Sequence, residues 1–166
     1  MSTTRTTPTD TSPTSADRYL RPGWFTRNVF NRLMGRFTKM GLSVRGSRVL
    51  HVRGRTSGEW RTVPVNPLVV DGTTYLVAPR GVTEWVRNIR VAGGGELQLG
   101  RKNRPITVVE LVDGDAKVSL LRAYLTAWKM EVGAFFDGVG PDAPDADLRR
   151  IAPGYPVFVV TFVEEA

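Results

Sequence analysis

The chain has 166 residues, of which 41% are hydrophobic, and this is enough to bury one hydrophobic core but hardly two. It contains no cysteine and only one histidine, His51, which excludes a disulfide framework, a thiolate nucleophile and a metal site built from several histidines. No metal is therefore expected. No apolar signal region opens the N-terminus and no uncharged apolar run reaches about 18 residues, which predicts a cytoplasmic protein.

The formal net charge of +7 is unevenly distributed along the chain. Residues 18–62 carry eleven Arg and Lys residues against one acid, Glu59, whereas residues 110–166 carry five against ten acids. The basic half predicts an anionic partner, such as a phosphorylated cofactor, an acidic membrane surface or nucleic acid, and a solvated face without a partner is the alternative. No nucleic acid is expected, because the cations are scattered over several elements and match no nucleic-acid-binding module.

Two segments precede the first expected strand. Residues 1–17 are rich in Ser, Thr and Pro and predict a disordered tail, followed by a single domain over residues 18–166. Apolar residues at helical spacing between Trp24 and Met40 predict an amphipathic helix over about residues 22–40. Its apolar stripe would pack on its own domain or on a second subunit in a homodimer, and its basic polar face leaves peripheral contact with anionic lipid as the alternative.

From residue 47 onward the apolar residues recur with a period of two, which predicts strands. We expect a three-stranded meander at 47–53, 62–70 and 73–78, with the Asp71-Gly72 turn before the last strand. The elements expected next are a helix over 83–91, strands at 96–99 and 105–112 around the turn 100–104, a helix from about 113 to 129, a Gly/Pro/Asp-rich loop and a sixth strand at 155–163. Six short strands with inserted helices predict a mainly β (α+β) fold, a small antiparallel barrel.

The segment from Gly54 to Pro64, with the sequence GRTSGEWRTVP, has the clearest functional pattern. Its two glycines allow close backbone approach, and Arg55, Arg61 and the neighbouring hydroxyls direct donors into a small volume, which suits phosphate or carboxylate. A Gly-rich basic hairpin without a ligand is the alternative. Further on, Trp85 and Asn88 share a helical face that could meet a flat heterocycle, or they serve as a core residue and a cap.

Three blocks in the order GRTSGEWRTVPV, DGTTYLVAPRG and EWVRNIRVAGGGELQLGRKNRPI resemble the deazaflavin-dependent nitroreductase and quinone reductase family over about residues 40–112, with weaker similarity to about 163. The resemblance implies a split β-barrel, similar to flavin reductases and FMN-binding proteins, that binds coenzyme F-420, a deazaflavin with a phosphate and an oligoglutamate tail. Thr56 stands where the family pattern has lysine, and Pro79 where it has serine. The cofactor-binding residues that the resemblance implies are Arg55, Thr56, Ser57, Gly58, Arg61, Thr62, Pro64, Val65, Ala78, Pro79, Arg80, Trp85 and Asn88.

The resemblance also implies an oxidoreductase that transfers hydride from the reduced cofactor to a quinone, an enone or a nitro compound. The cofactor carries this chemistry, while the protein binds, orients and excludes water. Tyr124 is the candidate proton donor and, with Trp128, Phe135 and Phe136, a candidate wall of the acceptor pocket; the alternative is that Tyr124 belongs to the core. FMN is the second choice of cofactor, since one phosphate needs fewer cations, and a non-catalytic carrier of a cofactor or lipid-like ligand with the same fold stays open.

Overall fold

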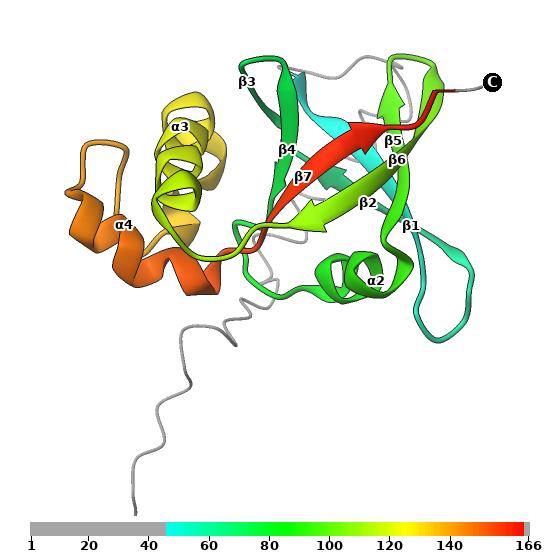
Figure 1. Ribbon diagram of the computed structural model, residues 1–166, viewed down its shortest axis with the longest axis horizontal. Helices are drawn as coiled ribbons and strands as arrows, with labels where there is room; N and C mark the ends of the chain where they lie inside the picture. Colours follow the sequence, from blue (N-terminus) through cyan, green and yellow to red (C-terminus); the bar gives the residue numbers. More distant parts are fainter. Residues whose placement is uncertain (1–45, 165–166) are drawn as a thin grey trace, which may run out of the picture.

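Seven antiparallel strands form one curled sheet in the computed structural model, which describes residues 46–164 (Figure 1). In space the strands follow the order β2-β1-β5-β6-β7-β4-β3. Their bounds are β1 Arg48–Arg53, β2 Trp60–Val65, β3 Leu68–Val70, β4 Thr73–Val77, β5 Gly94–Leu99, β6 Lys102–Glu110 and β7 Val157–Phe162. The expected tail over residues 1–17 and the expected helix over 22–40 lie outside the described residues.

Strands β2 and β3 follow each other in the chain, yet they lie at opposite edges of the sheet. The expected single strand over 62–70, and the meander that contained it, are therefore wrong. The break falls at Asn66 and Pro67, because proline cannot donate to a strand ladder and restricts the residue before it. The Asn66 side-chain oxygen accepts a hydrogen bond from Ser47 (2.7 Å), and the Pro67 carbonyl accepts one from the Trp128 indole (3.2 Å). The curled sheet is thus open between β2 and β3, which is the split barrel that was expected.

Two tight turns set the register of neighbouring strands. Val70 pairs with Thr73 across the Asp71-Gly72 turn, whose residues have φ values of 48° and 78°, so the expected two-residue turn is confirmed. Between β5 and β6 the turn is also only two residues long, since Leu99 pairs with Lys102. The expected polar turn over 100–104 was too long.

Three consecutive glycines, Gly93 to Gly95, form the junction between a helix and the strand β5. Gly93 ends the helix α2 (Glu84–Ala92) with a φ of 71°, which is a left-handed C-terminal residue. Gly94 and Gly95 already belong to β5, so this strand begins before the expected residue 96. A Cβ atom on Gly94 would lie less than 3.0 Å from the carbonyl oxygen of Ile106, and one on Gly95 would lie equally close to that of His51. Both neighbouring strands therefore approach β5 too closely for any larger residue.

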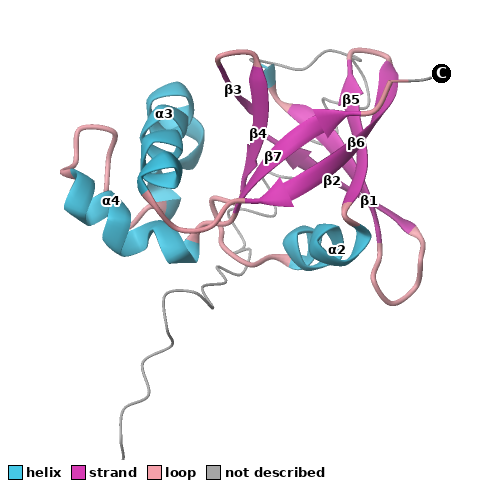
Figure 2. Cartoon of the chain, viewed as in Figure 1, coloured by secondary structure: helices cyan, strands magenta, loops and turns pink. Residues whose placement is uncertain are grey.

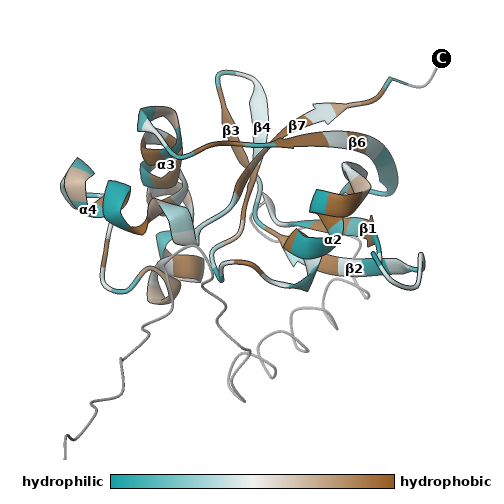
Figure 3. Ribbon diagram, turned by 60° about the horizontal axis from the view of Figure 1, so that its bottom comes forward, coloured by the Kyte–Doolittle hydropathy of each residue, from teal (hydrophilic) through white to brown (hydrophobic). Residues whose placement is uncertain are grey.

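The inner face of the sheet and α2 enclose one hydrophobic core. Alternate residues of each strand share a face, and those on the inner face pack against Val86 and Ile89 of α2, which is apolar toward the sheet and polar outside (Figure 3). The buried residues of this inner core are Leu50, Val52, Val65, Leu76, Ala78, Val86, Ile89, Leu97, Ile106, Phe158 and Val160. The core fixes α2 beside the end of β1, where the Gly54–Glu59 loop begins.

A second core lies on the outer face of β3, β4 and β7, under the helices α3 (Asp115–Val132) and α4 (Asp145–Ile151) (Figure 2). The helix predicted over about 113–129 is confirmed as α3, whereas α4 was not expected. Short 3-10 turns follow each helix, at Gly133–Phe135 and Ala152–Gly154. Arg122 of α3 donates to the carbonyl oxygen of Ala143 (2.8 Å) and to Asp145 (2.6 Å), which fixes the loop before α4. None of the helices in the described part of the chain is long and apolar enough to cross a membrane.

Candidate functional site

The loop between β1 and β2 is closed by its own backbone. The amide of Gly54 donates to Glu59 (2.8 Å), and the amide of Gly58 donates to Gly54 (2.8 Å). Gly58 has a φ of 70°, which suits glycine at this turn. Arg53 donates to the carbonyl oxygen of Gly58 (3.1 Å), and Ser57 accepts from the Glu59 amide (3.2 Å). Arg55, Thr56, Ser57 and Gly58 are all exposed, so a ligand can reach this loop from the solvent.

Arg55 joins this loop to α2. Its backbone amide donates to the side-chain oxygen of Asn88 at 3.2 Å, and its guanidinium donates to the same oxygen at 2.9 Å. The guanidinium also donates to Glu84 at 2.8 Å. Asn88 is buried, so its oxygen is held in place by the helix packing. The two sequence blocks that contain Arg55 and Asn88 therefore meet in space, as a common cofactor site requires.

Strand β2 carries four more of the expected site residues, and the pleat divides them between two faces. Arg61 and Val65 share the inner face, whereas Thr62 and Pro64 share the outer face. Val65 is buried in the inner core, while Arg61 and Thr62 are exposed. Because β2 is an edge strand, a flat ligand along this edge can reach side chains of both faces, which it could not do on a central strand.

The second and third blocks follow the chain from β4 into α2. Ala78 is buried, and its amide donates to the carbonyl oxygen of Pro156 (2.9 Å), while Pro79 and Arg80 are half-buried in the turn that follows. Trp85 is half-buried, and its ring lies 5.8 Å from the ring of Phe158. Ala78 and Trp85 both pack on the inner core, as Val65 does. All three sequence blocks therefore contribute residues to the same core.

The charges around the loop leave a positive surplus. Arg53, Arg55, Arg61 and Arg87 face two acids: Glu59, which is 3.4 Å from Arg61, and Glu84, which pairs with Arg55 (2.8 Å) and Arg87 (2.6 Å). Hydrogen bonds from Arg55 and then from Arg87 hold the pKa of the Glu84 carboxyl below its ordinary value. Arg53 also lies over the exposed ring of Trp60, 4.0 Å from its centre. This cationic set fits an anionic ligand.

A polar atom without a partner lies next to these blocks. The hydroxyl oxygen of Thr83 is buried at the N-terminus of α2, directly after the turn that follows Ala78, and it has no hydrogen-bond partner within residues 46–164. Buried polar groups are nearly always satisfied, and an exception indicates an ordered water or a ligand. Exposed arginines, hydroxyls and this unsatisfied group together fit the phosphate-bearing, heterocyclic ligand that the resemblance implies.

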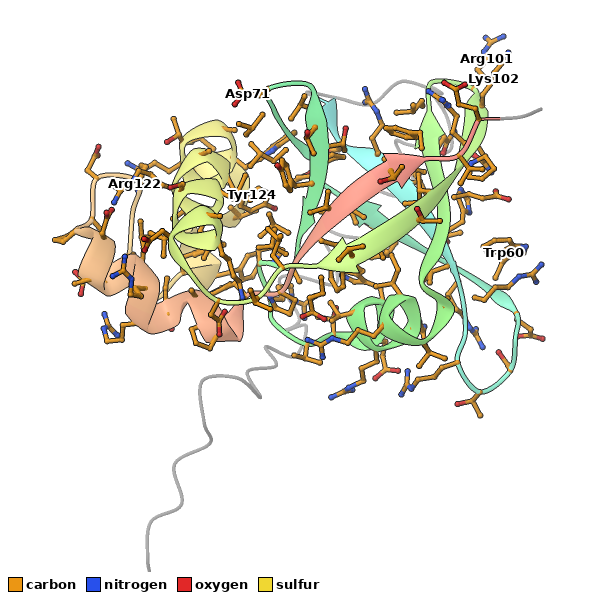
Figure 4. All side chains as sticks on the ribbon, viewed as in Figure 1. Trp60, Asp71, Arg101, Lys102, Arg122 and Tyr124 are labelled. Carbon is orange, nitrogen blue, oxygen red and sulfur yellow. The ribbon has the colours of Figure 1, made fainter. Side chains whose placement is uncertain are left out.

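The aromatic residues expected around the acceptor belong to the second core, which lies on the outer face of β3, β4 and β7. Tyr124 is 1% exposed and its ring lies 6.3 Å from that of Phe136, which in turn stacks on Tyr155 at 4.3 Å. Trp128 is buried and donates to the corner between β2 and β3. Figure 4 shows Tyr124 on the side of the barrel away from Trp60, which marks the β1–β2 hairpin. The described residues thus place Tyr124 in a packed environment.

Glu84 is a charged group of the site that the sequence interpretation did not include. It lies four residues before Asn88 in α2, so both side chains share the helix face that receives Arg55. In the sequence, Glu84 lies between Arg80 and Arg87 and four residues before Asn88. This pattern was a usable signal for a charged residue at the site.

Comparison with protein families finds a match to the F420H(2)-dependent quinone reductase family over residues 24–132, which is more than half of the chain. A solved structure described as a domain-swapped dimer is similar in fold, with a TM-score of 0.52 and 22% identity over 82% of this chain and 97% of that one. The structure of an F420-H2 dependent reductase (FDR-A) gives a TM-score of 0.51 and 22% identity over 72% and 99%. Comparison with curated proteins gives no significant match. The chain belongs to the F420H(2)-dependent quinone reductase family, and it is an F-420-dependent oxidoreductase with the split-barrel fold.

Proposed function

We propose that this protein transfers hydride from reduced F-420 to a small electron-poor acceptor, with a quinone as the first candidate and enones or nitro compounds as further acceptors. The contact between Arg55 and α2 carries the proposal, because it joins an anion-binding loop to the helix that bears Trp85 and Asn88. The family model supports a quinone. The bound cofactor supplies hydride in a two-electron step, and this chain's residues bind it, orient it and exclude water.

The anionic end of the cofactor is assigned to the loop and the start of β2. Arg55, Thr56, Ser57 and Arg61 are exposed there and donate hydrogen bonds suited to phosphate and carboxylate oxygens, and Gly58 allows close approach of the ligand. Thr56 offers a hydroxyl where the family pattern has a lysine, so Arg61 and Arg55 are the cations available at this point. The polyglutamate tail then has room to follow the exposed arginines.

The ring is assigned to the edge of β2 and to the turn between β4 and α2. Thr62, Pro64 and Val65 supply one side, of which Val65 contributes mainly from within the core. The residues at the other side are Ala78, Pro79, Arg80, Trp85 and Asn88. The Trp85 ring, half-buried on the inner core, is the aromatic surface available to a flat heterocycle in this group.

FMN is the second candidate for the cofactor. It would occupy the same ring site with a single phosphate, whereas the loop region presents four arginines against two glutamates. A ligand with several negative charges uses this surplus better than FMN does. We therefore expect F-420 to bind more tightly than FMN, with a difference that becomes smaller as salt screens the charges.

The reaction itself provides the direct test of this function. Reduced F-420 bound to the purified protein should be oxidised when menadione is added, and the reaction should saturate with menadione. A quinone that accepts a hydride also needs one proton to become a hydroquinone. Tyr124→Phe removes only the hydroxyl, so a lower kcat would support Tyr124 as the proton donor, and an unchanged kcat would leave it a packing residue. Tight F-420 binding without oxidation by any quinone, enone or nitro compound would favour a cofactor carrier.

Arg61→Ala should weaken F-420 binding about tenfold while the melting temperature stays close to that of the parent protein. The Arg61 side chain is 60% exposed and its ion pair with Glu59 spans 3.4 Å, so the fold depends little on it. A charge-assisted hydrogen bond to a ligand oxygen is worth about 1.5 kcal/mol, which is about tenfold in Kd. Fluorescence titration and thermal melting decide: a variant that melts much lower but binds normally would make Arg61 a structural residue.

Assembly and location stay proposals. The similar structure that is described as a domain-swapped dimer supports a homodimer. The basic helix expected over residues 22–40 supports peripheral membrane contact. The single domain over 18–166, its disordered tail and a cytoplasmic location likewise follow from the sequence interpretation alone. Sedimentation of the full chain with and without anionic vesicles would distinguish a free dimer from a membrane-bound form.

A further inference from the structure

Glu84 occupies the arginines that the proposed cofactor needs. One oxygen of its carboxylate lies 2.8 Å from the Arg55 guanidinium, and the other oxygen lies 2.6 Å from that of Arg87. A carboxylate that bridges two arginines in this way makes the same charge-assisted hydrogen bonds that a ligand phosphate or a glutamate tail would make. Glu84 is 61% exposed, so its side chain can move aside without breaking the core.

The position of Arg55 does not depend on Glu84. The side-chain oxygen of Asn88 accepts hydrogen bonds from the Arg55 backbone amide (3.2 Å) and from its guanidinium (2.9 Å), and Asn88 is buried in the packed face of α2. These two contacts hold Arg55 against the helix even if the acid is removed. What Glu84 adds is therefore a negative charge, placed at the point where an anion would bind.

We propose that Glu84 is a specificity-determining residue, an internal competitor that lowers the affinity of the loop for anions and does so more strongly for ligands with more negative charges. This inference rests on the proposed function, since it concerns the same site. A ligand anion must take Arg55 or Arg87 away from Glu84, or share them with it. Glu84 thus weakens the binding of a highly charged ligand at this loop.

The expected effect follows from the strength of exposed ion pairs. Such pairs contribute little each, and two of them together with the repulsion between Glu84 and the ligand should change Kd by about fivefold. Glu84→Gln should therefore bind F-420 about fivefold more tightly than the parent protein at low salt. The amide oxygen of the variant can still accept a hydrogen bond from Arg55, so the geometry is retained while the charge is lost. High salt should remove most of the difference.

The experiment compares the parent protein, Glu84→Gln and a matched control, Glu110→Gln. Glu110 pairs with Arg90 at 2.6 Å, also an exposed ion pair but at the other end of α2, so its removal changes the net charge equally. Titrations measure the Kd of F-420 and of inorganic tripolyphosphate at low and high salt. The proposal is supported if Glu84→Gln alone binds both ligands more tightly at low salt. Unchanged or weaker binding overturns it, and weaker binding would identify Glu84 as a positioning residue for Arg55.

The two ligands separate this inference from the proposed function. If the parent protein does not bind F-420, the proposed function is wrong, and tripolyphosphate then decides alone whether Glu84 restrains anion binding at the loop. If the parent binds F-420 but Glu84→Gln gains no affinity for either ligand, the proposed function stands and the inference is wrong. If neither the parent protein nor Glu84→Gln binds either ligand, both are wrong.

Discussion

Gly95→Ala should destabilise the protein by at least about 3 kcal/mol, which corresponds to a fall in melting temperature of about 10 °C. A Cβ atom at this position would lie less than 3.0 Å from the carbonyl oxygen of His51 on the neighbouring strand. Backbone atoms of a paired strand cannot rotate away as a side chain does, so β1 and β5 would have to separate. That pair holds together the half of the barrel from which the Gly54–Glu59 loop extends.

Gly114→Ala is the matched control for this change. An added Cβ atom at Gly114 meets nothing within 4 Å, and the residue has an extended backbone with a φ of 162°. Its free energy of unfolding should stay within about 0.5 kcal/mol of that of the parent protein. Thermal and urea unfolding of both variants test the expectation. If Gly95→Ala melts together with Gly114→Ala, the close approach of β1 and β5 is wrong.

Arg55→Ala should weaken F-420 binding on the order of hundredfold, or about 2.7 kcal/mol, which is a larger loss than that expected for Arg61→Ala. Three effects act in the same direction. The ligand loses a charge-assisted hydrogen bond, the loop loses its side-chain contacts with Asn88 and Glu84, and Glu84 keeps only Arg87 as a partner, so its negative charge repels the ligand more strongly. Fluorescence titration at about 0.1 M salt measures the effect.

Arg101→Ala controls for the loss of one positive charge. Arg101 lies in the exposed turn between β5 and β6, and Figure 4 shows it pointing away from the barrel. Its substitution should change the Kd of F-420 less than threefold, since exposed charges farther apart than about 10 Å are largely screened. A Kd for Arg55→Ala that equals the Kd for Arg101→Ala would remove Arg55 from the site. Arg55→Lys should recover only part of the affinity, because a lysine has one terminal nitrogen and lacks the planar guanidinium that can offer further donors to a ligand anion.

Most strands could be predicted from the sequence because alternating apolar residues and the Asp71-Gly72 turn are local signals. The separation of β2 from β3 could not. Asn66-Pro67 is a local signal for a break, but it does not reveal that the two strands lie at opposite edges of the sheet, which depends on tertiary contacts such as those of Ser47 and Trp128. Helix α4 was missed for a related reason. It is a seven-residue helix between Gly/Pro-rich segments, and it is held by the distant Arg122 rather than by a strong periodicity of its own.

In the candidate site too, some features follow from local sequence signals and others depend on contacts between distant parts of the chain. Arg55, Thr56, Ser57 and Gly58 could be proposed as ligand-binding residues from the sequence, because glycines, hydroxyls and arginines within a few residues give a local signal. Arg55 donates two hydrogen bonds to Asn88, which lies far away in the sequence. Only the structure could reveal this contact. The same limit applied to Tyr124, whose burial depends on contacts between α3 and the segment before β7.

The segment that contains α3 and α4 leaves the sheet after β6 and re-enters it at β7, and these two points are neighbours. The Leu111 amide, directly after β6, donates to the carbonyl oxygen of Val157 at the start of β7 (2.8 Å), and the two strands pair from there on. In topological terms this helical segment is one long connection within a β-hairpin. The length of this connection can therefore change without a shift in the register between β6 and β7.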